Sequence, residues 1–191
     1  MIRKDVEVFV SSAVSTSREI ELYARLFASP ESEIFIRLYP ETFKILQYSL
    51  LKNIVLNVCS FFDPAGDRRG NKNLSVAYIQ KKYVDAISEN GSDAARQALV
   101  LFEELQIDGY RNKYFAHADV DTLTAEEMLQ HQLSTESLLR LCIHLMTLGL
   151  DIDDESCGIN AYQLFTESRM ASADNGTALL SLMSHVGFQN A

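Results

Sequence analysis

The chain has 191 residues, 47% of them hydrophobic, which is enough apolar material for one compact domain. Its formal net charge of -9 at pH 7 argues against a protein that coats nucleic acid non-specifically, because such binding is driven by clustered Lys and Arg. The cysteines Cys59, Cys142 and Cys157 are odd in number and widely spaced, so they indicate reduced, mostly buried thiols rather than disulfides or a paired zinc site.

The N-terminus does not resemble a signal peptide. Asp5 and Glu7 interrupt the segment that would have to be apolar, and no uninterrupted apolar run approaches the length of a membrane span. The sequence therefore predicts a cytoplasmic protein with no membrane contact.

Hydrophobic periodicity predicts helices from the start of the chain. Apolar residues recur at nearly helical spacing from about 4 to 27, as in a long amphipathic helix. Ser29 and Pro30 then offer an N-cap and a first residue for a short helix that ends near Tyr39. Residues 41–62 are apolar around most of the helix circumference, which predicts the central core helix, surrounded by others.

The next segment combines turn residues with positive charge. Pro64, Gly66 and Gly70 predict a loop, after which Asn73 could cap a helix that runs through about Ser88. Between positions 67 and 83 five cations stand against one anion; the cations are Arg68, Arg69, Lys72, Lys81 and Lys82. A solvated helix face with a charged loop explains this cluster, and so does a surface that guides a nucleic-acid strand.

The second half of the chain also has helical signals. Asn90-Gly91 predicts a break, with Ser92 capping a helix that continues to Asp119 and is weakened at Gly109. Later starts are predicted by the Thr124 to Glu127 capping box and by Ser134 or Thr135, and a short helix is predicted around 178–186. The expected fold is therefore all-α, a bundle of about five to seven helices in a single domain over 1–191.

Several familiar binding patterns are absent from the sequence. The "DIDDESCGINAY" stretch has Ser156 and Tyr162 where a calcium loop needs Gly and Glu, and "GDRRGNK" lacks the spacing of a phosphate-binding P-loop. His131, His144 and His185 have no ligand partner at metal-binding spacing. We therefore expect no metal and no cofactor.

The stretch "YRNKYFAHAD" carries the residues best suited to chemistry. His117 can exchange a proton near neutral pH, because the free pKa of His is about 6.5. Arg111 can hold a phosphate through a bidentate fork and stabilise negative charge on its oxygens. Asn112 can position either partner by hydrogen bonding. This set of side chains favours work on a phosphodiester.

A purely structural interpretation of the same stretch stays open. On a regular helix, Arg111 and His117 point about 120° apart, so they do not share a face. Near a helix C-terminus the dipole stabilises cations, which would explain Arg111, Lys113 and His117 without any ligand, with Asp119 starting the turn.

Arg111-Asn112 followed by His117 resembles the signature of the HEPN superfamily, a family of nucleotide-binding helical domains. The longer form "RNKYFAHAD" is similar to the branch associated with bacterial abortive infection, as are the preceding "FFDPAG" and "NKNLSV". The resemblance covers about 41–150. It leaves the long N-terminal helix and a C-terminal helical appendage as additions packed on that core.

This resemblance implies a homodimer that acts as a metal-independent endoribonuclease in a toxin-antitoxin or phage-defence setting, with RNA as substrate and an antitoxin protein as a possible partner. His117 would act as acid or base, Arg111 would stabilise the phosphorane and Asn112 would orient. Lys113 and Asp119 are further binding candidates; Arg68, Arg69 and Lys72 would guide the strand. The motif itself provides a single His per chain, which supports a dimer independently, since cleavage needs both an acid and a base.

The alternative is a non-catalytic dimeric interaction module or RNA-binding or nucleotide-binding module. In that case the motif would stabilise the dimer through contacts between Arg111 and Asp119 across the two-fold axis.

Overall fold

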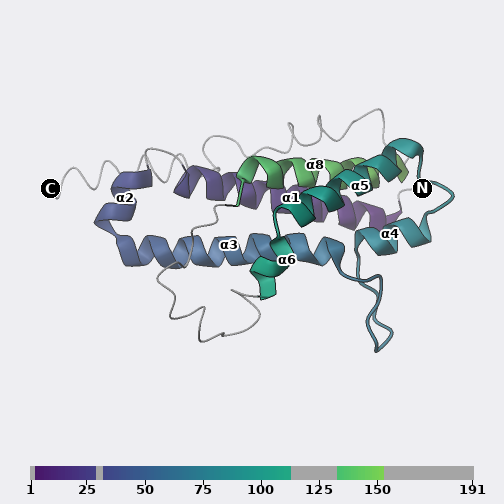
Figure 1. Ribbon diagram of the computed structural model, residues 1–191, viewed down its shortest axis with the longest axis horizontal. Helices are drawn as coiled ribbons and strands as arrows, with labels where there is room; N and C mark the ends of the chain where they lie inside the picture. Colours follow the sequence, from purple (N-terminus) through teal and green to yellow (C-terminus); the bar gives the residue numbers. More distant parts are fainter. Residues whose placement is uncertain (1–2, 29–31, 113–132, 153–191) are drawn as a thin grey trace.

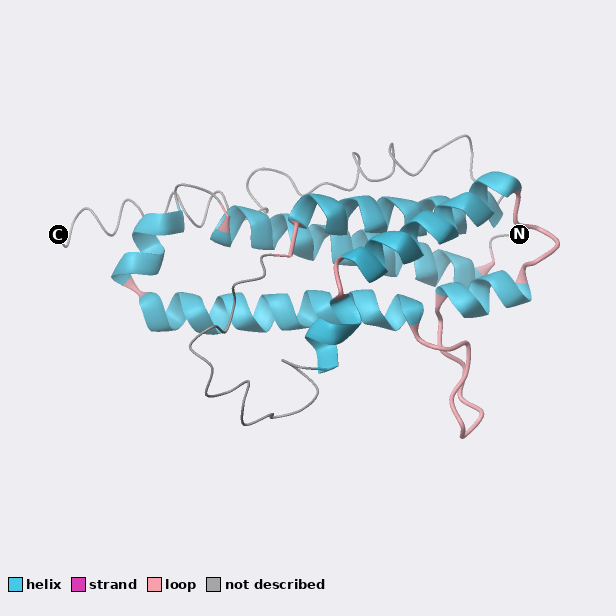
Figure 2. Ribbon diagram, viewed as in Figure 1, coloured by secondary structure: helices cyan, strands magenta, loops and turns pink. Residues whose placement is uncertain are grey.

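The structure, a computed structural model, describes residues 3–28, 32–112 and 133–152. Within these ranges the chain forms seven helices and no strand, which confirms the predicted all-α bundle (Figures 1 and 2). The helices are α1 (Lys4–Phe27), α2 (Ser32–Leu38), α3 (Pro40–Phe62), α4 (Val76–Lys82), α5 (Glu89–Glu104), α6 (Ile107–Tyr110) and α8 (Thr135–Ile152).

The most periodic helix predictions are confirmed. The first helix covers Lys4–Phe27, and the third begins one residue before its predicted start, with Pro40 in the first turn. The Ser134 side chain accepts a hydrogen bond from the Ser137 amide, so Ser134 caps α8 as predicted. The predicted cap at Ser29, the capping box at Thr124 and the helix around 178–186 lie outside the described residues.

Helix α8 packs on both α1 and α5 along much of its length (Figure 1). Its side chains Leu141, Leu145 and Leu148 are fully buried. At Gly149 the backbone of α8 approaches α1 so closely that an added Cβ would collide with the Val10 side chain. Burial of apolar area is the main stabilising term, and α1 contributes buried side chains to the same hydrophobic core as α8.

Helix α3 is not the surrounded core helix that its composition predicts. One face of its second half is buried, with Ile54, Val55 and Val58 at 1% exposure or less. In its first half, Ile45 is 64% and Leu46 is 48% exposed. The prediction was wrong because composition alone does not show which apolar side chains a neighbour covers.

Among the described helices, α3 alone is long and apolar enough to cross a membrane, and 33% of its most apolar window is buried. Length and composition are a weak indication, because core helices pass the same criterion.

Helix α5 begins at Glu89, not at Asp93, and Ser88 rather than Ser92 is its cap. The Ser88 hydroxyl accepts hydrogen bonds from the amides of Asn90 and Gly91. It also donates to Asp151 at the end of α8, over 2.6 Å. An added Cβ at Gly91 would overlap the Asp151 carboxylate, so this glycine marks a close approach of two helices and not the predicted break.

Three further helix boundaries differ from the prediction. Ser75, not Asn73, caps α4, and this helix ends at Lys82 instead of continuing to Ser88. Asn73 donates to the Pro64 carbonyl from its side chain, over 2.8 Å, and so closes the base of the preceding loop. Helix α5 stops at Glu104 because Gln106 adopts a left-handed conformation with φ of 51°.

Candidate functional site

The short helix α6 carries the motif residues to the surface. Gln106 redirects the chain after α5, and Ile107 and Tyr110 then bury their side chains, leaving 0% and 8% exposed. The buried Cys59 thiol of α3 points at the Ile107 carbonyl, with 3.9 Å between sulfur and oxygen. These apolar anchors fix α6 against α3, so Arg111 directly after α6 has a defined position.

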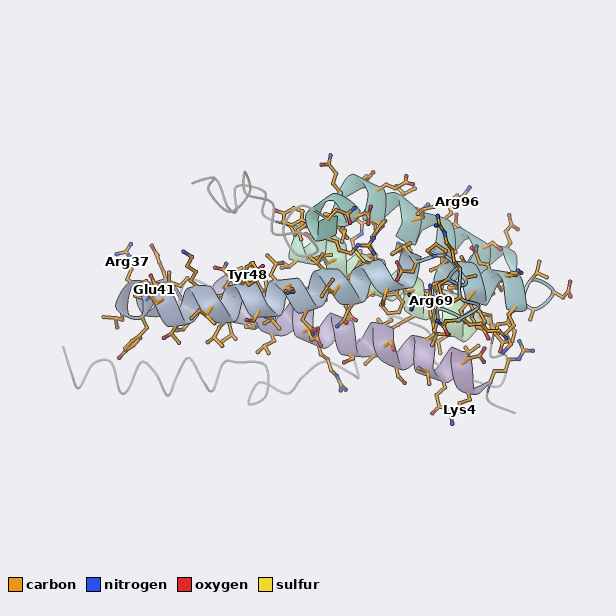
Figure 3. All side chains as sticks on the ribbon, turned by 90° about the horizontal axis from the view of Figure 1, so that it is seen from below. Lys4, Arg37, Glu41, Tyr48, Arg69 and Arg96 are labelled. Atoms are coloured by element: carbon orange, nitrogen blue, oxygen red, sulfur yellow. The ribbon has the colours of Figure 1, made fainter. Side chains whose placement is uncertain are left out.

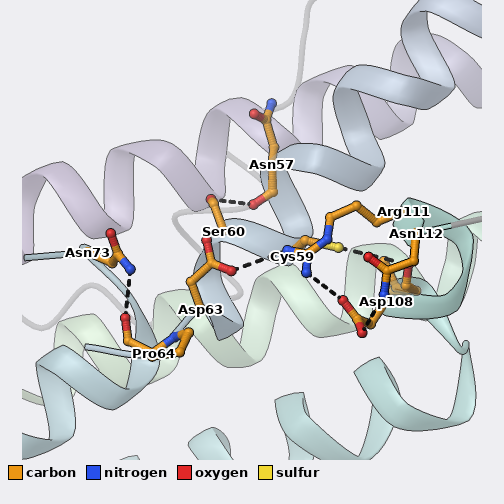
Figure 4. A network of polar contacts seen from close by, with 10 residues as sticks. Asn57, Cys59, Ser60, Asp63, Pro64, Asn73, Asp108, Arg111 and Asn112 are labelled. Carbon is orange, nitrogen blue, oxygen red and sulfur yellow. Dashed lines mark hydrogen bonds and ion pairs between the residues drawn. The ribbon is translucent and has the colours of Figure 1, made fainter. Parts of the chain in front are cut away.

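Arg111 lies between two carboxylates (Figure 4). Its Nη1 is 3.2 Å from Asp63 Oδ1, and its Nη2 is 2.8 Å from Asp108 Oδ1. The Arg111 side chain is 31% exposed, so solvent reaches part of the guanidinium. Half-exposed ion pairs contribute about 0–1 kcal/mol each, so these contacts orient Arg111 more than they stabilise the fold.

Asp108 also holds the neighbouring motif residue. Its Oδ2 accepts a hydrogen bond of 3.1 Å from the Asn112 side chain, so one carboxylate fixes both Arg111 and Asn112 (Figure 4). A guanidinium has more N–H donors than these two carboxylates use. Arg111 can therefore accept a further anion while it keeps its contact with Asp108.

Asp63 owes its position to the end of α3. It is the C-cap of that helix, in an extended conformation with φ of -61° and ψ of 151°, as expected before Pro64. The carboxylate thus leaves the helix axis and reaches Arg111, 48 positions later in the chain.

Cys59 is close to Arg111, but it is not a nucleophile. Burial raises the pKa of the Cys59 thiol to about 11, although the positive charge of Arg111 acts in the opposite direction. The thiol is therefore protonated at neutral pH, and the thiolate is the reactive form. The structure assigns Cys59 to packing.

The helix widens at the motif itself. Arg111 and Asn112 lie in a π-helical turn, which has more residues per turn than an α-helix. The divergence of about 120° between Arg111 and His117 applies to a regular α-helix, and Arg111 and Asn112 do not lie in one. His117, Lys113 and Asp119 lie outside the described residues.

The predicted loop between α3 and α4 is ordered by its own polar contacts. Asp67 accepts hydrogen bonds from the amides of Arg69 and Asn71 and from the Asn71 side chain. These hydrogen bonds, that of the Asn71 side chain foremost, lower the pKa of Asp67. Arg68, Arg69 and Lys72 are exposed, as predicted, and a bridge between Gly66 and Lys72 fixes the base of the loop.

A groove of about 320 Å³ extends from this loop to Asp63, one of the two carboxylates that hold Arg111. We call it the Asp63 groove; its polar lining is Ser12, Ser60, Asp63, Lys72 and Asn73. In Figure 4, Asp63 lies between Arg111 on one side and the contact of Asn73 with Pro64 on the other. Lys72 thus shares the groove with Asp63, the partner of Arg111, whereas Arg111, Arg68 and Arg69 do not line it.

Sequence reasoning missed both carboxylates that hold Arg111. Asp108 precedes Arg111 by three residues, the spacing of neighbours on a helix, so it could have been predicted. Asp63 could not, because only the tertiary packing of α6 on α3 brings it there. The described residues contain no group of three or more His, Cys, Asp or Glu side chains that could hold a metal ion.

Neither a protein-family model, nor a curated protein, nor a solved structure matches this chain. The HEPN resemblance therefore rests on the quoted sequence segments alone; of its signature residues, the structure describes Arg111 and Asn112.

Proposed function

We propose that this chain is a HEPN-like, metal-independent endoribonuclease that acts as a cytoplasmic homodimer in a toxin-antitoxin or phage-defence setting, with an antitoxin protein as partner. One observation carries the proposal. Arg111 is held in a fixed orientation, partly exposed, next to a groove that also contains Lys72. An oriented guanidinium beside an accessible groove suits a backbone phosphate.

The proposed reaction is attack of an RNA 2'-hydroxyl on the adjacent phosphorus. A base removes the 2'-hydroxyl proton as the oxygen-phosphorus bond forms, and an acid gives a proton to the departing 5'-oxygen. The products are a 2',3'-cyclic phosphate and a 5'-hydroxyl. His117 serves as acid or base, and two subunits supply both roles.

Arg111 stabilises the charge that builds on the phosphorane oxygens, and Asn112 orients a reacting group. Lys113 adds a phosphate contact. For Arg111 to bind phosphate, the longer contact to Asp63 gives way while Asp108 keeps the guanidinium in place.

The test is cleavage of total cellular RNA in the presence of EDTA. His117→Ala is expected to lose about 100-fold to 10,000-fold in rate, the usual contribution of a general acid or base. The matched control is His144→Gln, which removes a half-buried histidine of α8 and should cleave like the wild type. Full activity of His117→Ala, or no cleavage by the wild type, would exclude the ribonuclease.

A second function is supported by the two carboxylates around Arg111, since they neutralise its charge as they would in a structural tie. In that case the chain is a non-catalytic dimeric module. Asp119→Ala would then abolish the dimer in sedimentation experiments, and no RNA-dependent property would change.

A further inference from the structure

A second groove lies beside the Asp63 groove, at the end of the molecule where α1 begins. We call it the Lys4 groove; it has a volume of about 470 Å³ and is lined by Lys4, Asp5, Val8, Lys72, Tyr78 and Lys82. These residues come from the first turns of α1, from the ordered loop and from α4. Figure 3 shows Lys4 and Arg69 at the same end of the molecule, with Arg37 and Glu41 at the other.

The Lys4 groove is positively charged on an otherwise acidic chain. It holds three lysines and one carboxylate, whereas the whole chain has a net charge of -9. Lys82 is paired with Asp5, over 2.6 Å. Lys4 and Lys72 are exposed and have no ion-pair partner among the residues that the structure describes. Two positive charges are therefore left for an anionic ligand.

The wall of this groove is held in place by Asp5. Its carboxylate accepts hydrogen bonds from the hydroxyls of Tyr78 and Tyr83, over 3.4 and 2.6 Å, in addition to the Lys82 ammonium. The Lys82 ammonium lies 5.5 Å from the centre of the Tyr78 ring, and the Arg3 guanidinium lies over Tyr83. An aromatic ring is thus fixed among cations, an arrangement that suits stacking of a base beside its phosphate.

The two grooves are continuous, because both are lined by Lys72, Asn73 and Leu74. The backbone bridge to Gly66 fixes Lys72 at this junction. A ligand that passes from Asp63, the partner of Arg111, along the Asp63 groove therefore reaches Lys72, then Lys4 and Tyr78.

We propose that the Lys4 groove binds single-stranded RNA next to the cleavage site, with Lys4 and Lys72 on backbone phosphates and Tyr78 under a base. This inference rests on the proposed function for the identity of the ligand. A chain of phosphates matches cations spread over two joined grooves, and a base matches the fixed ring, whereas a free phosphate would use only the cations.

The experiment measures the affinity of a fluorescently labelled single-stranded RNA by anisotropy, over a range of salt concentrations and in the His117→Ala background, so that no strand is cut. Lys4→Gln with Lys72→Gln should weaken binding on the order of tenfold or more. It should also reduce the slope of log affinity against log salt by about 1.4, since each phosphate contact on a single strand contributes about 0.7.

Tyr78→Leu separates RNA from a free polyanion. This variant keeps the apolar volume and removes the ring, so it should weaken RNA binding and leave the affinity for tripolyphosphate unchanged. If the double lysine variant weakens both ligands but Tyr78→Leu weakens neither, the site takes free polyphosphate and the RNA assignment is overturned.

The matched control is Lys44→Gln with Lys52→Gln, which removes two positive charges from α3 outside both grooves. The proposal is overturned if this control weakens RNA binding as much as the groove variant does, or if the groove variant binds like the wild type. The binding measurement also tests this proposal separately from the ribonuclease. If the groove variants lose RNA affinity but the wild type does not cleave RNA, the Lys4 groove binds RNA and the chain is not a ribonuclease. If the wild type cleaves RNA but the groove variants keep full affinity, the ribonuclease stands and the groove proposal is overturned.

Discussion

Asp63, the partner of Arg111, lines the same groove as Lys72, yet the charges of Arg111 and Lys72 are in opposite situations. Arg111 is held by Asp63 and Asp108, so it has a fixed orientation and little net charge around it. Lys4 and Lys72 are exposed and have no carboxylate partner within the described part of the chain. The difference separates two tasks: the lysines can attract a phosphate chain, and Arg111 can act on one phosphate that is already in place.

The strongest way to test this division is Arg111→Gln. Removing a preorganised charge stabiliser should reduce RNA cleavage by about 100-fold to 1,000-fold, with a much smaller loss of RNA affinity. The matched control is Arg96→Gln, because Arg96 also pairs with an aspartate three residues earlier, on α5. Equal losses in both variants would show that the effect is one of charge or stability, and not of the site.

A smaller effect is expected when Arg111 is released from one carboxylate. Asp63→Asn keeps the shape of the side chain and removes its negative charge, so RNA should bind about threefold to tenfold more tightly. The thermal stability should change little, since the pair is half exposed. Anisotropy measures the affinity, and weaker binding would mean that Asp63 itself contacts the ligand favourably.

The loop offers a still smaller change on the lysine side of the comparison. Asp67→Ala removes the hydrogen bonds that order the loop but leaves every cation in place. Because binding then has to order the loop, RNA affinity should fall about twofold to threefold. Unchanged affinity would show that Lys72 is fixed by the bridge to Gly66 alone.

A last effect concerns the stability of the Lys4 groove in acid and is measured on folding rather than on RNA binding. Burial alone would raise the pKa of Asp5, but hydrogen bonds from Lys82 and Tyr83 outweigh it and lower this pKa from 3.8 to about 2. A carboxyl with a lowered pKa contributes stability above its unfolded pKa, and this contribution is lost as the pH falls from about 4 through about 2. In melting curves from pH 5 to 2, the free energy of unfolding of the wild type should therefore fall by about 1 kcal/mol more than that of Asp5→Asn.

Hydrophobic periodicity predicted the helices correctly where residues close together in the sequence determine them. The helix Lys4–Phe27, most of Pro40–Phe62 and the start of α8 at Ser134 follow from apolar spacing and cap residues. Ser88 and Ser92 are equally good caps in the sequence. Asp151, which lies 63 positions after Ser88 and binds it, decided between them.

The candidate site was predictable to a similar degree. Residue types identified Arg111 and Asn112, and helical spacing would have identified Asp108. Asp63 and the lysine at position 4 come from other helices, so only the packing of α6 on α3 and of α4 near α1 brings them to the same surface. His117, Lys113 and Asp119 stay predictions.

The most direct measurement is cleavage of one short oligonucleotide in EDTA, as RNA and as the same sequence in DNA. The proposal predicts that the wild type cuts the RNA, leaves a 2',3'-cyclic phosphate, and spares the DNA, which lacks the attacking hydroxyl. Failure to cut the RNA, or equal cleavage of the DNA, would contradict it.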